Sequence, residues 1–144
     1  MITDSTAEIA EQLRHVLRPE QASVIVSNTE TIRVDSPSSR VEHALEVRRR
    51  AMGDFEVAFV VPNKKGSPFE QLFVGPGLEE SLVIREVVAF VSDIVNERVV
   101  LAWESNGLRA GRRFLQAQAI GSAERCKYAW GVSWAGALSW ERSA

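Results

Sequence analysis

Two groups of arginines are the residues of this 144-residue chain whose type and spacing best suit binding chemistry. The first is the run at residues 48–50, and the second consists of Arg109, Arg112 and Arg113. Successive strand residues alternate between faces, so Arg49 points inward if its two neighbours point outward. Guanidinium groups bind carboxylates and phosphates through paired hydrogen bonds, so convergence of the two groups would create a site for an anion or an acidic partner. The simpler interpretation is ordinary solubility with local ion pairing.

Tryptophans are the second candidate for contact with a ligand or partner. Three of the four lie in the last fifteen residues. Trp130 and Trp134 share a face if they lie on one strand. If that face is exposed, the rings can stack on a ligand or anchor a protein partner; if it is buried, they pack in the core. A core role is preferred for these two, whereas Trp140 is expected to be exposed. The binding candidates are therefore Arg49, Arg112, Arg113, Trp130, Trp134 and Trp140.

The sequence contains no recognisable motif for catalysis or cofactor binding. His15 and His43 are far apart, and neither has the spacing of a metal site. Cys126 would share a strand face with Tyr128 and Trp130, which favours a buried, inert thiol. No nucleophile elbow, phosphate-binding loop or dinucleotide-binding fingerprint occurs. We therefore predict no catalytic residue, no metal ligand and no cofactor, and we favour a protein that is not an enzyme.

The charge balance argues against two classes of partner. A net charge of −2, with 25% charged residues, is unlike a nonspecific nucleic-acid binder or a binder of anionic membranes. The single cysteine cannot form an internal disulfide. No basic segment followed by an apolar core opens the sequence, and its longest apolar run, at residues 82–95, is too short and too charged to span a bilayer. A cytoplasmic protein is expected.

The element that must position these residues is a helix predicted over residues 78–96. At 100° per residue its apolar side chains fall in one arc, and its polar residues fill the other side. A strand would place charge on both faces, which excludes that alternative. Such a helix needs a broad apolar surface, most simply a sheet. The arc consists of Val83, Ile84, Val87, Val88, Phe90, Val91, Ile94 and Val95.

A second helix is predicted over residues 4–18. Ser5 and Glu8 have the spacing of a capping box, and Pro19 ends the pattern. Its apolar stripe is narrow, so this helix is expected at the edge of the sheet.

Runs rich in β-branched and aromatic residues predict the strands. Two segments, residues 41–51 and 125–140, also fit a helix. We prefer a strand for the first because Gly53 and Asp54 then form a hairpin turn. Glycines at 131 and 136 favour a strand in the second. The predicted strands lie at residues 22–27, 31–35, 41–51, 54–61, 69–74, 98–103, 113–119 and 125–134.

Together these elements predict a single α+β domain spanning residues 1–144. An antiparallel, meander-like sheet of about six to eight strands carries the long helix on one face. Two helices are too few to cover both faces. The uncovered face should therefore be charged, with Arg48, Arg50, Glu56 and Glu70 on it.

Two functions from different classes fit this description. The first is a small non-enzymatic interaction domain that caps or escorts a protein partner, like an immunity protein or a chaperone, with a homo-oligomer also possible. The second is a binder of, or enzyme for, an anionic small molecule, with the arginines as clamp and Trp130 or Trp134 as stacking wall. The second requires a pocket that contains at least two of the arginines and one of those tryptophans.

Overall fold

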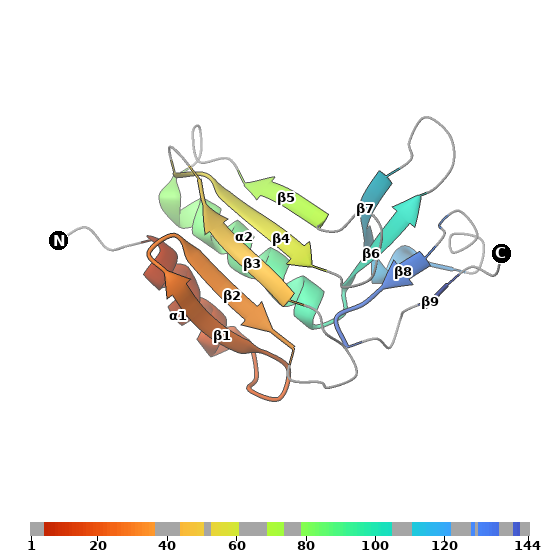
Figure 1. Cartoon of the computed structure of the whole chain (residues 1–144), viewed down its shortest axis with the longest axis horizontal. Helices are drawn as coiled ribbons and strands as arrows, with labels where there is room; N and C mark the ends of the chain where they lie inside the picture. The colour runs from red at the N-terminus through yellow and green to blue at the C-terminus, as the bar shows by residue number, and fades with distance from the viewer. Residues whose placement is uncertain are drawn as a thin grey trace.

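The computed structural model describes residues 5–36, 44–50, 53–60, 69–73, 79–104, 111–121, 128, 130–135 and 140–141. Within these ranges the chain forms two α-helices and two antiparallel sheets, which confirms the predicted α+β class (Figure 1). Neither helix in this part of the chain is long and apolar enough to cross a membrane.

The first sheet is a five-stranded meander in which each strand pairs with the next along the chain. Between β3 and β4, Gly53 adopts a positive φ of 79°, and the Arg50 N–H donates to the Asp54 carbonyl at 2.7 Å. The predicted hairpin turn is therefore present, and the strand interpretation is confirmed for 44–49, whereas residues 41–43 lie outside the described ranges. The strands are β1 (Ser23–Asn28), β2 (Thr31–Asp35), β3 (Ala44–Arg49), β4 (Phe55–Val60) and β5 (Phe69–Phe73).

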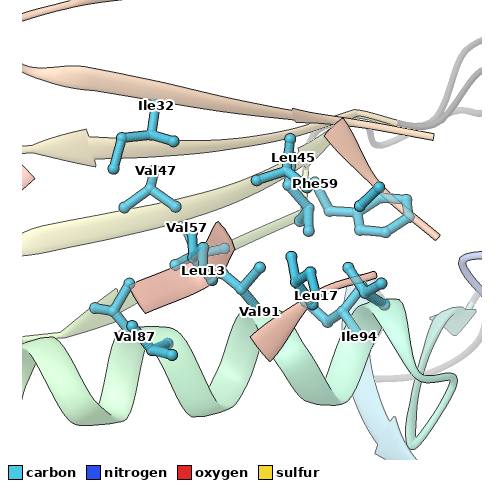
Figure 2. Close-up of a cluster of buried hydrophobic side chains, with 14 of the residues drawn as sticks. Leu13, Leu17, Ile32, Leu45, Val47, Val57, Phe59, Val87, Val91 and Ile94 are labelled. Atoms are coloured by element: carbon cyan, nitrogen blue, oxygen red, sulfur yellow. The ribbon is translucent and has the colours of Figure 1, made fainter. Parts of the chain in front are cut away.

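Both helices, α1 (Ser5–Val16) and α2 (Glu80–Val95), lie on the same face of this sheet (Figure 1). Seven of the eight residues in the predicted apolar arc of α2 are buried, and Phe90 is half-buried. Figure 2 shows Val87, Val91 and Ile94 directed toward the apolar side chains of the sheet. Helix α1 packs beside α2 and against β1, which is the edge position that its narrow stripe predicted.

The remaining strands form a second sheet, which corrects the prediction of one sheet with six to eight strands. Strand β6 has β7 on one side and β8 on the other, so neither of its edges is open to β5. This interior position agrees with the low polar content of the segment. The strands are β6 (Val99–Glu104), β7 (Gly111–Gln116), β8 (Trp130–Val132) and β9 (Trp140–Glu141), with a short 3-10 turn, η3 (Ala117–Ala119), after β7.

Aromatic side chains join the two sheets into one continuous core. Phe90 of α2 lies 5.4 Å from Phe73 of β5 and 5.1 Å from Phe114 of β7, measured between ring centroids. Phe59 of β4 meets Trp134 edge-on at 5.8 Å. A single cluster of buried side chains therefore includes residues of both helices and both sheets.

The last of the predicted strands, which contains β8, ends earlier in the chain than predicted. Strand β8 ends at Val132, and Trp134 lies in the following turn instead of sharing a strand with Trp130. This turn directs Trp134 back toward the five-stranded sheet, where its ring contacts Phe59. The rest of the predicted strand, residues 125–127 and 129, lies outside the described ranges.

Candidate functional site

Most of the described charged side chains of the five-stranded sheet lie on the face that is turned away from the helices. We call it the helix-free face, and none of the described helices or strands lies over it (Figure 1). The strand register places Arg33 opposite Glu46, and Arg48 opposite Glu56. Arg48, Arg50 and Glu56 lie here as predicted, whereas the side chain of Glu70 is outside the description. Its charged residues with described side chains are Arg33, Asp35, Glu46, Arg48, Arg50 and Glu56.

Glu56 is the most buried charged residue of this face, with a relative exposure of 7%. One of its oxygens, Oε2, accepts from the guanidinium of Arg50 and lies 3.7 Å from Nη1 of Arg48. Arg48 also donates to Oε2 of Glu46 at 2.6 Å. A carboxylate this buried must be paired to remain charged, and the two arginines supply that pairing.

A second, more exposed pair continues the same face on β2. Arg33 Nε donates to Oδ1 of Asp35 at 2.6 Å. This hydrogen bond, and the charge of Asp35, raise the pKa of Arg33 further above its usual value. The described side chains of this face, three arginines and three carboxylates, combine ordered charges of both signs.

A cleft of about 510 Å³ lies at the C-terminal end of α2. The described residues that line it include two carboxylates and no arginine or lysine, so they offer an anionic substrate no counter-charge. They are Glu20, Gln21, Ser36, Val95, Asn96, Glu97, Trp134 and Ala135.

Glu97, which lines this cleft, has an unusual backbone conformation. Its φ of 59° lies in the left-handed region, where the residue after a helix is usually glycine. The Glu97 N–H donates to the Ile94 carbonyl at 3.0 Å and the Arg98 N–H to the Asp93 carbonyl at 2.8 Å, the two bonds of a Schellman motif. Oε1 of Glu97 accepts from Ser133 Oγ at 2.6 Å and from the Ala135 N–H at 2.9 Å. The carboxylate therefore fastens the turn after β8 to the end of α2.

Trp134 lines the cleft and belongs to the core, with a relative exposure of 2%. Its Nε1–H donates to the Gln21 carbonyl at 2.9 Å. The side chain of Gln21 in turn donates to Oδ1 of Asn96 at 2.9 Å. These bonds connect the α1–β1 loop, the end of α2 and the C-terminal turn, so the ring has a structural role and is not an open stacking wall.

The predicted binding tryptophans are engaged inside the fold. Trp130 is 8% exposed, which agrees with the preferred core interpretation. Trp140 is half-buried, whereas an exposed anchor was expected. Strand pairing places Trp140 opposite Gly131, and a Cβ atom added at Gly131 would lie only 2.1 Å from the Trp140 ring. The ring therefore covers the glycine in β8.

The predicted arginines are distributed over two sheets. Arg49 ends β3 on the helix-covered side, as its inward parity predicted, but it is exposed there. Arg112 and Arg113 lie on β7, opposite Trp103 and Ala102, and their side chains are outside the description. The described lining of the cleft includes Trp134 and none of these arginines. The convergence that the small-molecule hypothesis requires is not seen in this part of the structure.

Other expected features occupy ordinary positions or lie outside the description. His15 is exposed near the end of α1, and His43 and Cys126 fall in the ranges that are not described. No group of three metal-ligating side chains is found among the described residues.

Glu97 and Ser133 were missed by the sequence analysis. The predicted helix is not followed by the glycine that commonly ends a helix, and this was the only sign in the sequence that Glu97 occupies that position.

Comparisons of this chain with protein-family models, with curated proteins and with solved structures found no match.

Proposed function

We propose that this chain is a non-enzymatic protein-interaction domain that caps or escorts one protein partner, as immunity proteins and chaperones do, and that it binds through the helix-free face. The observation that carries this proposal is the pairing of Arg48 and Arg50 over the buried carboxylate of Glu56. An ion-paired array on a face with no described element over it is already ordered before a partner arrives.

Such an array suits protein recognition better than small-molecule chemistry. Charged groups with fixed positions confer specificity, because a partner must present the complementary pattern and mismatched charges are repelled. Arginine is also enriched at protein interfaces. Because the described charges of this face are of both signs, the proposal requires a partner with a matching mixture of acidic and basic groups. A uniformly charged polymer would not match it.

Site-specific photo-crosslinking in lysate of the source cells tests the proposal. The crosslinking residue replaces Arg33 on the helix-free face or, as the matched control, the exposed Glu86 on α2. We expect one protein other than this chain to be captured from position 33 and not from position 86, and native mass spectrometry to show a stoichiometric complex with that protein. The charge reversal Glu46→Arg should weaken that complex at least tenfold. Equal capture from both positions, or no stoichiometric complex, would contradict the proposal.

A further inference from the structure

The outer strand β1 has the character of an unprotected sheet edge. It pairs with β2 alone among the described strands, and its residues Ile25 and Val26 are 48% and 43% exposed. Val26 lies on the helix-covered side and is still exposed, so α1 does not extend over it. The segment Ser23–Asn28 contains no charged residue and no proline, which are the usual means of preventing edge pairing.

The hydrogen-bond pattern shows which backbone groups of this edge point outward. The Arg49 N–H donates to the Glu30 carbonyl at 2.7 Å, so Glu30 forms its backbone hydrogen bonds with β3. Because the direction of these bonds alternates along a strand, the even-numbered residues of β2 point their N–H and C=O groups toward β3, and the odd-numbered residues point theirs toward β1. Arg33 lies opposite Ile25, and Ile25 therefore bonds inward to β2. Val24 and Val26 consequently direct their N–H and C=O groups away from the sheet.

The sequence of this edge reads the same in both directions: Ser23-Val24-Ile25-Val26-Ser27. We propose that two copies of this chain associate by antiparallel pairing of this segment about a twofold axis at Ile25, which joins the two five-stranded sheets into one. A twofold interface brings the same surface of each copy together, and a palindromic strand is complementary to itself in that arrangement.

The palindromic register also satisfies the hydrogen bonds. It places Val24 of one copy opposite Val26 of the other. The outward-pointing N–H and C=O groups of these two residues can then form hydrogen bonds with each other. Ile25 meets its own counterpart on the helix-free side, and the valines meet one another on the helix-covered side. β-branched residues that face each other across strands stabilise a sheet, and no like charges are opposed within the five residues.

One contact competes with this pairing. Nη2 of Arg14, on α1, donates to the outward carbonyl of Val24 at 3.2 Å. Pairing with a second copy displaces this exposed arginine. We therefore expect a concentration-dependent dimer that Arg14→Ala strengthens. Arg33 of the proposed partner site lies opposite Ile25, but the inference does not depend on that site, because it is tested on the isolated chain with no partner present.

Analytical ultracentrifugation of the full chain, alone and over a range of concentrations, tests the inference. We expect a monomer–dimer equilibrium that Ile25→Lys and Ile25→Glu each weaken at least tenfold, because two like charges then meet at the axis. Mixing the two variants should restore a dimer, since lysine then faces glutamate. Leu82→Lys, at an exposed apolar position on α2, is the matched control and should dimerise like the wild type. Thermal unfolding confirms that each variant is folded.

A chain that stays monomeric at every concentration overturns the inference. So does a dimer that Ile25→Lys leaves unchanged, because its interface then lies elsewhere. Failure of the mixed variants to associate excludes the axis at Ile25. If the isolated chain is monomeric and a different protein occupies the edge, with Ile25→Lys abolishing that complex, the edge binds a foreign strand and self-pairing is wrong.

Discussion

Ser133 Oγ donates a 2.6 Å hydrogen bond to Oε1 of Glu97 across a separation of 36 residues. The bond explains why glutamate occupies a backbone position that favours glycine. A non-glycine residue in the left-handed region costs about 1–2 kcal/mol, and charge-assisted hydrogen bonds of about 1.5–3 kcal/mol each offset that cost. The end of α2 and the turn after β8 are thereby held together at the cleft.

Two substitutions at Glu97 separate the cost of the left-handed backbone from the stabilisation by the side-chain hydrogen bonds. Glu97→Ala removes the acceptor and keeps the strained backbone, so the free energy of unfolding should fall by about 2–3 kcal/mol. Glu97→Gly also removes the acceptor but relieves the strain, and should cost roughly 1 kcal/mol less. Urea denaturation of both variants measures the difference. If the glycine variant proves no more stable than the alanine variant, the left-handed conformation is not a source of strain here.

The contact between Trp140 and Gly131 supports a second prediction. Gly131→Ala introduces a Cβ that would overlap the indole ring, which must then move, at a cost of roughly 1–3 kcal/mol. In a Trp140→Ala background the same substitution should cost far less, because the overlapping ring is gone. A double-mutant cycle by urea denaturation measures the coupling free energy between the two positions. Additive effects would show that the ring does not cover the glycine in solution.

Local features of the sequence predicted the helices and the hairpin turn well. The apolar arc of α2 depends on a 3.6-residue period, and the β3–β4 turn depends on Gly53, so both are encoded by neighbouring residues. The division into two sheets is not encoded locally. It follows from the pairing of β6 with β8, segments separated in the sequence by β7 and the residues after it.

The candidate site was likewise predicted only where it depends on neighbouring residues. The charged character of the helix-free face follows from strand parity, which the sequence displays. The position of Trp134 does not, because strand parity holds only as far as the strand continues, and β8 ends at Val132. Its hydrogen bond to Gln21 joins residues that are distant in the chain, and sequence periodicity carries no information about such a contact.

Trp134 provides a third prediction. Trp134→Phe retains most of the apolar area but loses the Nε1–H donor to the Gln21 carbonyl, so stability should fall by about 1–2 kcal/mol. Trp134→Ala also opens a cavity beside Phe59 and should cost about 3–5 kcal/mol. Thermal and urea unfolding measure both. Equal losses for the two variants would mean that the ring contributes no packing beyond its hydrogen bond.

The paired charges of the helix-free face give the last prediction, which contrasts a buried carboxylate with a more exposed one. Glu56→Gln leaves Arg48 and Arg50 without their shared carboxylate and should lower the free energy of unfolding by about 1–3 kcal/mol. Asp35→Asn breaks the exposed pair with Arg33 and should cost at most about 1 kcal/mol. Urea denaturation at low salt measures both losses.

Repeating those measurements in concentrated sodium chloride distinguishes the two pairs. Salt screens exposed charges strongly and buried ones weakly. The loss caused by Asp35→Asn should therefore disappear in high salt, whereas more than half of the loss caused by Glu56→Gln should remain. If salt abolishes both losses equally, Glu56 is solvated and the helix-free face lacks the ordered charge pairing on which the proposed partner recognition depends.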